Sequence, residues 1–331
     1  MDSQGNVMQA SAVAHPNVAL IKYWGKQDVV ENIPAVGSLS LTLAGLETRT
    51  TVSFDSSLES DQVQINGEID QRASAQAQQC LDLLRRQADC DLSARIESTN
   101  NFPTAAGLAS SASGYAALVK AASAALSLDL DTAELADIAR HGSGSAARSL
   151  YPGIVALQCL EDEARILIEC ESVASPTDWP LVVVVAITST QMKAIGSTEG
   201  MERSRLTSPY YSAWVDTHVN DLEAGLRCVS NRDFFQLADL SEHSCLKMHA
   251  VAQSSIPPLL YWSGATVDVM HRIQKLRADK VPVFFTVDAG PQVKAVCLPE
   301  CVEEVSRELA AMPGVLDVLV APLGLGARVV A

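Results

Sequence analysis

The sequence contains no apolar run long enough to cross a membrane. Its longest strongly apolar stretch covers residues 181–187, whereas a membrane helix needs about 20 apolar residues. The first ten residues, MDSQGNVMQA, have neither the basic nor the apolar segment of a secretory signal. We therefore expect no membrane partner and a cytoplasmic location.

Basic residues are also scarce. The chain has 24 lysines and arginines against 39 aspartates and glutamates, which gives a formal net charge of −15. Nucleic acids and anionic membranes bind to broad basic surfaces, so we expect no nucleic-acid partner. An anionic ligand would have to be bound by a few local donors against the field of the whole chain.

Cysteine pairs and hydrolase motifs are missing as well. The eight cysteines are scattered without CxxC spacing, and without a signal for an oxidising compartment we expect free thiols. Neither HExxH nor GxSxG occurs, which weighs against a metalloprotease and a serine hydrolase.

What the chain does contain is enough apolar residues, 48% of 331, for two packed domains. The apolar periodicity predicts an α+β protein with a strand-rich first half and a helix-rich second half. Prolines 176 and 180 mark a candidate boundary, and we expect domains over residues 1–184 and 185–331. Predicted strands cover residues 19–23, 38–43, 48–54, 62–65, 155–158, 164–168, 181–187, 281–288 and 315–321. Predicted helices cover residues 74–86, 112–126, 131–140, 212–229, 233–248, 261–278 and 301–312, with Asp131 as an N-cap.

The segment FPTAAGLASSAS, residues 102–113, joins small residues to the start of an alanine-rich helix. Small side chains let the backbone approach a ligand, and the free N–H groups and dipole of a helix N-terminus attract anions. Ser110 and Ser111 add hydroxyl donors. The segment is typical of a phosphate cradle, although an ordinary strand–turn–helix junction has the same composition.

Two Gly-Ser pairs precede Arg148 in HGSGSAARS, residues 141–149. Backbone amides, hydroxyls and one planar guanidinium suit a carboxylate or a phosphate. A flexible loop with an incidental arginine is the alternative.

In HPNVALIKYWGKQD, residues 15–28, two lysines flank an aromatic pair. If the strand predicted here is correct, Lys22 and Tyr23 point to opposite faces, and Lys26 lies in the turn beyond Gly25. The alternative is a half-buried strand with a solvated lysine end.

In TVDAGP, residues 286–291, Asp288 stands at the end of an apolar strand and before a Gly-Pro turn. A carboxylate in that place is either a turn former or a catalytic group at the strand end. The local pattern leaves both interpretations open.

Taken in order along the chain, these segments resemble the mevalonate diphosphate decarboxylase family of the GHMP kinase superfamily. The resemblance is carried by NVALIKYWGK, PTAAGLASSA, GSGSAARS, GSTEGM and DAGP, which together span nearly the whole chain. IKYWGK and GSGSAARS are more specific than the generic glycine-rich loop of the superfamily.

The resemblance implies a ribosomal-S5-domain-2-like N-terminal domain and a ferredoxin-like C-terminal domain, with the active site in the cleft between them. It implies ATP-dependent decarboxylation of mevalonate 5-diphosphate to isopentenyl diphosphate, with ADP, phosphate and CO2, in the mevalonate pathway of isoprenoid biosynthesis. ATP would first phosphorylate the 3-hydroxyl, with Mg²⁺ present. Homodimers are common in the family.

The family's functional residues carry over to the matching positions of this chain. The catalytic positions would be Asp288, Arg148, Lys22, Ser111 and Asn17. The substrate would contact Arg148, Tyr23, Lys26, Ser143, Ser145 and Ser197. ATP would contact Ser98, Pro103, Ala106, Gly107, Leu108, Ala109, Ser110 and Ser111. Mg²⁺ would be held mainly by ATP phosphates and water rather than by a protein site.

The chain departs from the family pattern at a few positions. Gln292 follows DAGP where the family usually has asparagine, which puts one side-chain contact in doubt. Thr198 follows Ser197 where some bacterial members carry arginine, so one diphosphate partner would be missing or supplied elsewhere. Ala147 replaces a cysteine of some relatives, which we interpret as neutral.

Three rival functions are closest. They are a decarboxylase of mevalonate 5-phosphate, a mevalonate 3-kinase, and a catalytically silent nucleotide-binding relative. Retention of Asp288, Lys22 and Arg148 together favours an active decarboxylase, and Tyr23, Lys26 and the Gly-Ser pairs favour the diphosphate.

Overall fold

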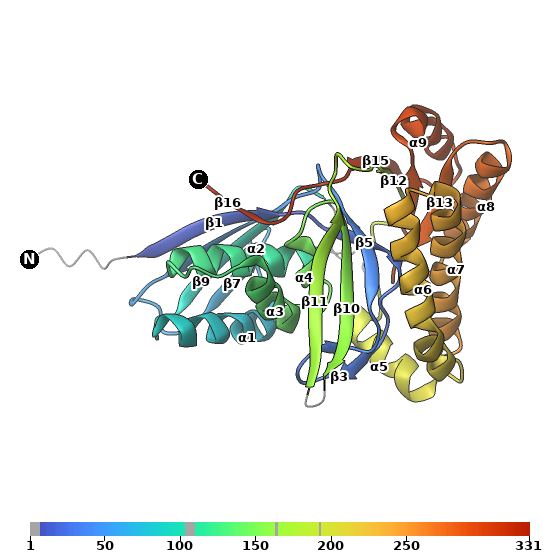
Figure 1. Cartoon of the computed structure of the whole chain (residues 1–331). Helices are drawn as coiled ribbons and strands as arrows, with labels where there is room; N and C mark the ends of the chain where they lie inside the picture. The colour runs from blue at the N-terminus through green and yellow to red at the C-terminus, as the bar shows by residue number, and fades with distance from the viewer. Residues whose placement is uncertain (1–6, 103–109, 163–164, 192) are drawn as a thin grey trace, which may run out of the picture.

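The computed structural model describes residues 7–102, 110–162, 165–191 and 193–331. Three larger sheets and the helices that cover them form two halves joined along a central sheet (Figure 1). The prediction of a mixed helix and strand protein is confirmed. The predicted ATP contacts Pro103, Ala106, Gly107, Leu108 and Ala109 lie outside the described residues.

The first sheet has six strands in the order β16-β1-β6-β9-β7-β8. Its centre is antiparallel, because β6 pairs with β1 on one side and with β9 on the other. Alternate residues of β6, namely Thr48, Thr50, Val52 and Phe54, are buried and the residues between them are less buried, as expected of a half-buried strand. The strands are β1 (Met8–Ala14), β6 (Thr48–Phe54), β7 (Gln62–Ile65), β8 (Glu68–Ile69), β9 (Ala94–Asn100) and β16 (Arg328–Val330).

Helices cover the buried face of this sheet. The helices that contact its strands are α1 (Gln71–Ala88) and α2 (Ser110–Ala125), and α3 (Thr132–Gly142) and the short α4 (Ala146–Ser149) pack on these two helices and on the second sheet. The alanine-rich α2 packs closely on β1 and β6 because its small side chains let the backbones approach. Asp131 caps α3 through a capping box with Glu134, so the predicted N-cap is confirmed.

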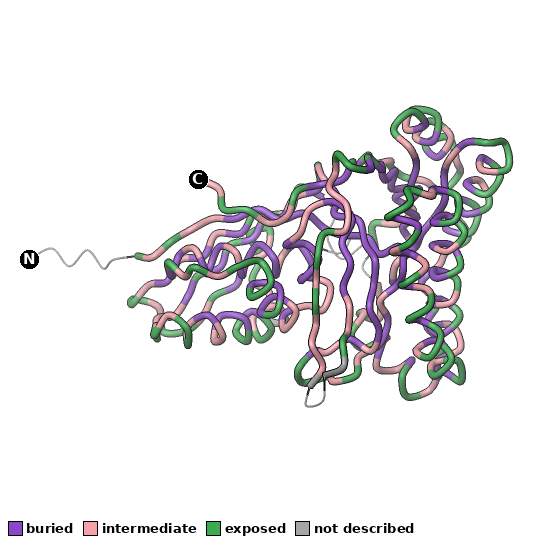
Figure 2. The backbone as a smooth tube through the Cα atoms, viewed as in Figure 1, coloured by how far each residue is buried: buried purple, intermediate pink, exposed green. Residues whose placement is uncertain are grey.

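The second sheet, in the order β11-β10-β5-β2, lies between the two halves. Its strands are β2 (Asn17–Ile21), β5 (Ser38–Thr42), β10 (Ile154–Asp162) and β11 (Arg165–Ala174), and a small hairpin of β3 (Lys26–Asp28) and β4 (Ile33–Pro34) follows β2. Every residue of β2 and β5 is buried, and Figure 2 shows this buried seam near the middle of the molecule. Leu20 and Leu41 share one core with Val183, Leu222 and Leu237 of the second half.

The third sheet is antiparallel in the order β13-β14-β12-β15. Its strands are β12 (Val182–Ile187), β13 (Val283–Val287), β14 (Val293–Cys297) and β15 (Asp317–Pro322). The helices of this half are α5 (Ser197–Thr207), α6 (Tyr211–Asn231), α7 (Phe234–Gln253), α8 (Gly264–Ala278) and α9 (Val302–Ala310), which follows the short 3-10 helix η1 (Pro299–Cys301). Helix α7 packs on both β13 and β2, so it links the third sheet to the second.

The chain crosses between the halves a second time near its end. After β15 has paired with β12, the chain returns to the first half, where β16 pairs with β1. The expected division after residue 184 falls inside β12 and stays a prediction.

Within the described part of the chain, none of the helices has the length and apolar character needed to span a membrane. All eight cysteines carry free thiols, as predicted.

Several predicted elements needed correction. The strand predicted over residues 19–23 ends at Ile21, so Lys22 and Tyr23 follow the strand, and Lys26 begins β3 instead of lying in a turn. The hairpin predicted within residues 155–168 is longer on both strands. The elements that the periodicity did not predict are β1, β3, β4, β8, β9, β14, β16, α4, α5 and η1.

Candidate active site

A cavity of about 680 Å³ lies where the ends of β2, β13, α2, α4 and α5 meet. It brings together residues that are up to 272 positions apart in the sequence, from Asn17 to Ala289. Ten of the predicted site residues line it, namely Asn17, Lys22, Tyr23, Lys26, Ser111, Ser143, Ser145, Arg148, Ser197 and Asp288.

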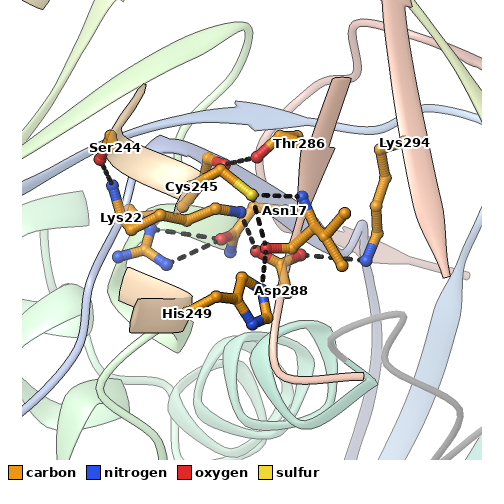
Figure 3. Close-up of polar contacts among 11 residues, drawn as sticks. Asn17, Lys22, Ser244, Cys245, His249, Thr286, Asp288 and Lys294 are labelled. Carbon is orange, nitrogen blue, oxygen red and sulfur yellow. Dashed lines mark hydrogen bonds and ion pairs between the residues drawn. The ribbon is translucent and has the colours of Figure 1, made fainter. Parts of the chain in front are cut away.

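Asp288 follows the last residue of β13, and two lysines approach its carboxylate from opposite sides (Figure 3). The Nζ atom of Lys22 lies 2.6 Å from Oδ1, and the Nζ atom of Lys294 lies 3.2 Å from Oδ2. The lysine side chains are 1% and 2% exposed, whereas that of Asp288 is 26% exposed. The carboxylate thus faces the cavity while both ammonium groups stay in the protein interior.

The two lysines determine the ionisation of this carboxylate. Burial alone would raise the pKa of Asp288, but the charges and hydrogen bonds of Lys22 and Lys294 outweigh it and hold the pKa well below its ordinary value. Burial and the neighbouring Lys22 lower the pKa of Lys294, against the opposing pull of Asp288. Asp288 is therefore a carboxylate throughout the neutral pH range.

Helix α7 fixes the backbone on both sides of this cluster. The Oγ atom of Ser244 accepts the backbone N–H of Lys22 at 3.0 Å, directly after β2 ends. Further along the helix, Cys245 Sγ accepts the N–H of Val287 at 3.2 Å, and His249 Nε2 donates to the carbonyl of Val287 at 3.1 Å. Val287 is the last residue of the edge strand β13, so these side chains take the place of a neighbouring strand just before Asp288.

The Asn17 side chain holds Arg148. The Nε and one terminal nitrogen of Arg148 donate to Oδ1 of Asn17 at 3.2 and 3.1 Å, and the other terminal nitrogen donates to Ser38 Oγ at 2.7 Å. The amide of Asn17 is fixed in turn by Ser149 Oγ and by the carbonyl of Ser145. The guanidinium, only 3% exposed, is immobilised at the cavity wall.

The Gly-Ser loop before α4 forms the wall next to Tyr23. A Cβ at Gly144 would lie 2.6 Å from the Tyr23 hydroxyl oxygen, so this close approach requires glycine. That hydroxyl is buried and has no hydrogen-bond partner among the described residues. Burial raises the pKa of Tyr23, which keeps it a neutral O–H donor. Across the loop, the hydroxyls of Ser143 and Ser145 lie 3.1 Å apart.

A turn at Gly25 carries the chain from the aromatic pair to Lys26. Gly25 has a φ of +106°, which favours glycine, and a side chain there would collide with Tyr211. Lys26 lines the cavity at its outer side, and burial lowers its pKa against the opposing charge of Glu202.

The segment before α5 supplies a further cation. Lys193 donates to Ser197 Oγ at 2.9 Å and to the carbonyl of Ala289 at 3.3 Å, which ties the start of α5 to the turn after Asp288. Burial lowers the pKa of Lys193, although Asp288 opposes the shift. Thr198, at the position where some relatives have arginine, also lines the cavity.

The described lining residues carry four cationic side chains and one carboxylate. The cations are Lys22, Lys26, Arg148 and Lys193. In a chain with a net charge of −15 this is a local reversal of sign, and it suits a ligand with several negative charges. The arrangement can bind phosphates and a carboxylate while it keeps one ionised acid beside them.

Two family models match the chain in succession. Residues 14–166 match the diphosphomevalonate decarboxylase-like N-terminal domain, and residues 183–315 match the mevalonate 5-diphosphate decarboxylase C-terminal domain. A diphosphomevalonate decarboxylase of Candida albicans is 36% identical over 299 residues, which are 85% of this chain and 82% of the relative. The chain belongs to the diphosphomevalonate decarboxylase family.

Solved structures agree with the family over the whole length. A structure of the mevalonate diphosphate decarboxylase from Enterococcus faecalis aligns with a TM-score of 0.87 and 35% identity, covering 98% of this chain and 99% of that one. A complex of a protein designated MDDEF with MVAPP, AMPPCP and magnesium aligns with a TM-score of 0.90, 35% identity and the same coverage. The predicted family, its two-domain GHMP kinase fold and its enzymatic nature are confirmed.

Not every predicted contact of this decarboxylase lies at the cavity wall. The hydroxyl of Ser98 lies 2.8 Å from Thr50 Oγ1 inside the first sheet. Ser110 begins α2, whereas Ser111 faces the cavity with its Oγ 3.5 Å from that of Ser143. Ser98 and Ser110 are not among the described lining residues.

The departure at Gln292 also has a place in the structure. Its Oε1 accepts the N–H of Thr188 at 2.6 Å, and its Nε2 donates to the carbonyl of Ser189 at 2.5 Å. Gln292 therefore joins the turn after Asp288 to the segment that follows β12.

The sequence interpretation missed Lys193 and Lys294. A single lysine in the apolar strand VKAVC was a signal for a buried, paired cation, because lysine is almost never fully buried alone. Lys193 has no such signal, since it stands in a polar loop.

Among the described residues, no group of three or more His, Cys, Asp and Glu side chains is arranged to hold a metal ion.

Proposed function

We propose that this cavity binds mevalonate 5-diphosphate beside ATP and converts the two to isopentenyl diphosphate, ADP, phosphate and CO2. The observation that carries the proposal is the ionised Asp288 at the cavity wall, held by Lys22 and Lys294 and accompanied by Arg148. A carboxylate next to a fixed guanidinium suits a substrate that has both a hydroxyl group and a carboxylate to be oriented.

The reaction has two steps. The γ-phosphoryl group passes from ATP to the oxygen of the 3-hydroxyl, which loses its proton. The bond between C3 and this oxygen then breaks with departure of phosphate, the bond to the carboxyl carbon breaks with release of CO2, and the electron pair of that bond forms the alkene. ADP leaves as the nucleotide product.

Asp288 would orient the 3-hydroxyl and receive its proton. Because its pKa is held low, it is a weak base at neutral pH, and a loose phosphoryl-transfer transition state asks mainly for positioning and for stabilised charge. Lys22, with its ammonium on Oδ1, would stabilise the phosphoryl group in transit as a point charge.

Arg148 would hold the substrate carboxylate. Its three hydrogen bonds to Asn17 and Ser38 use three of the five guanidinium N–H groups and leave two for a ligand. Asn17 would act through Arg148 by fixing the plane of the guanidinium.

Of the remaining lining residues, some would contact the substrate diphosphate and others the phosphates of ATP. The unpartnered hydroxyl of Tyr23 and the ammonium of Lys26 would contact the substrate diphosphate, together with Ser143, Ser145 and Ser197. Ser111 would contact the ATP phosphates at the N-terminus of α2, where a first turn without acidic residues favours an anion. Ser98, Ser110 and the segment 103–109 complete the expected ATP contacts, and Mg²⁺ would bridge ATP phosphates and water.

A comparison of three substrates tests the proposal. ADP release is measured with mevalonate, mevalonate 5-phosphate and mevalonate 5-diphosphate in parallel, and the organic product is identified by mass. We expect turnover of the diphosphate alone, with isopentenyl diphosphate as product. Three outcomes would each reject the proposal: preference for the monophosphate, a stable 3-phosphate product, or nucleotide binding without turnover. The matching family members carry the name diphosphomevalonate decarboxylase, which does not favour the three rival functions.

Three further expectations belong to the proposal. We expect the N-terminal and C-terminal domains to divide near residue 184, and limited proteolysis would locate the division. A homodimer is expected from the family resemblance, and light scattering would measure its mass. A cytoplasmic location is the third expectation, and cell fractionation would test it.

A further inference from the structure

Lys294 is a buried lysine that touches the proposed catalytic carboxylate from behind. It is the one charged residue in the five-residue strand β14, it is 2% exposed, and its Nζ lies 3.2 Å from Oδ2 of Asp288. It is not among the described residues that line the cavity. A buried ammonium group is costly unless it is paired, so this position calls for an explanation.

The surroundings of Asp288 show why a second lysine matters. The groups that face it are Lys22 after β2, Lys193 before α5, Arg148 on α4, Cys245 and His249 on α7, and Lys294 on β14. Lys22 and Lys294 make the direct contacts, one on each carboxylate oxygen (Figure 3). With only one of them, the carboxylate would be free to turn about its Cβ–Cγ bond.

We propose that Lys294 is a positioning residue, which holds Oδ2 of Asp288 so that the carboxylate keeps one orientation toward Lys22 and the cavity. It acts only through Asp288, because Asp288 lies between it and the reactants. This inference rests on the proposed function, since it assigns Lys294 a part in the phosphorylation of the 3-hydroxyl. Misplaced catalytic groups lower the rate of the chemical step more than they weaken binding.

A double-mutant cycle tests the proposal in the full-length enzyme. Lys294→Met keeps the length of the side chain and removes its charge; Asp288→Asn and the double variant complete the cycle. We expect Lys294→Met to lower kcat at least about tenfold while the KM for mevalonate 5-diphosphate changes less than about threefold. In the Asp288→Asn background, measured by single turnover, the same change should alter the rate less than about threefold.

Several results would overturn the proposal. One is a kcat of Lys294→Met within about threefold of wild type, and another is a rise in KM with no fall in kcat. The third is an equal fall in rate in the wild-type and Asp288→Asn backgrounds, which would mean that Lys294 acts without Asp288. Lys275→Met, on the exposed face of α8, is the matched control and should leave both constants unchanged. If Lys294→Met does not fold, Lys294→Leu, which likewise removes both the charge and the donor to Oδ2, takes its place under the same criteria.

A second cycle separates this proposal from the proposed function. The unfolding free energies of the same four proteins, measured in denaturant, report the coupling between Lys294 and Asp288 without any turnover. Additive effects would overturn the proposed contact. A coupled pair in a wild-type protein that does not decarboxylate mevalonate 5-diphosphate would instead reject the proposed function, and with it the part assigned to Lys294.

Discussion

Asn17 and Arg148 form a rigid pair, in which a single side-chain oxygen accepts two N–H groups of the guanidinium at 3.2 and 3.1 Å. The pair spans 131 positions of sequence and joins the start of β2 to α4. Because the amide of Asn17 is itself fixed by Ser149, the plane of the guanidinium is set before a ligand arrives. Pre-set geometry of this kind lowers the cost of ordering a substrate.

Arg148→Lys should lower kcat/KM for mevalonate 5-diphosphate by at least about 100-fold. A lysine keeps the charge but cannot contact Asn17, Ser38 and a carboxylate in one plane. Steady-state kinetics checks the prediction. Arg205→Lys, which alters an exposed pair with Glu202, serves as the control. Near-normal kinetics in Arg148→Lys would show that the carboxylate is held elsewhere.

Asp288→Ala should reduce kcat by orders of magnitude, while the diphosphate still binds. The carboxylate is the one anionic group among the described lining residues, so its loss removes the orienting group for the hydroxyl and leaves the cationic groups in place. Stopped-flow or quench kinetics and calorimetric binding measure the two effects separately. A kcat within about tenfold of wild type would exclude Asp288 as the catalytic group. The exposed Asp279 provides the control, Asp279→Ala.

Lys26→Ala should raise the KM for mevalonate 5-diphosphate about tenfold and change kcat less than about threefold. A charged contact made equally in the ground state and the transition state affects binding alone, and one such contact is worth about 1.5 to 3 kcal/mol. The comparison with Lys275→Ala, an exposed lysine on α8, controls for the loss of charge. An unchanged KM would mean that Lys26 does not contact the diphosphate.

Stability should fall as the pH decreases below about 6.5, in part through His249. Burial lowers the pKa of His249 to about 3. Below pH 6.5, therefore, the imidazole is protonated in the unfolded chain but stays neutral in the folded chain. The contribution is complete above pH 6.5 and is lost progressively toward pH 3. Between pH 7.5 and 5.5 the loss from this residue is about 1.4 kcal/mol.

Denaturant unfolding at those two pH values checks the effect. His249→Gln, which keeps a donor for the carbonyl of Val287 but does not titrate, should reduce the difference by about 1.4 kcal/mol. His243→Gln, on the exposed side of the same helix, should not. An equal pH dependence in His249→Gln and wild type would show that His249 is protonated in the fold. Burial lowers the pKa of His218 to about 4, so His218 contributes a loss of the same sign.

Gln292→Leu should destabilise the fold by about 1 to 3 kcal/mol, because it removes the partners of a backbone N–H at Thr188 and a carbonyl at Ser189. Gln274→Leu, at an exposed position of α8, is the control for added apolar surface. Equal stabilities of the Gln292 variant and wild type would show that water replaces both bonds.

The sequence could predict much of the fold where the local signal was strong, as in the threonine-rich β6 and the amphipathic α6. It could not predict α5, because STEGMERSRLT has no apolar stripe and is held by packing at a few positions such as Met201 and Ser204. Strand β9 was missed because only Ala94 and Ile96 are apolar on its buried side, where the next buried residue is the polar Ser98. Burial of β14 on both faces removed the alternation that identifies a strand.

The sequence predicted the residues of the candidate site better than it predicted the residues that hold them in place. Motif strings placed Lys22, Arg148 and Asp288 in one site although they are far apart in the chain. The contacts of Val287 with Cys245 and His249 depend on how α7 crosses β13, and no local pattern carries a crossing angle. The lone lysine of VKAVC indicated that Lys294 is buried and paired, but it did not identify Asp288, at the end of β13, as the partner.

The return of the chain from β15 to β16 gives the two halves a second covalent link, besides the one that leads into β12. Near this link the carbonyl of Gly324 accepts the backbone N–H of Gly153, and the N–H of Gly324 donates to the carbonyl of Thr42. Two bodies joined at two separate points keep fewer independent rotations than two bodies on one tether. Any widening of the cavity is therefore restricted to turning about the line through both links, and the end of the chain shares in setting that axis although it contributes no group to the chemistry.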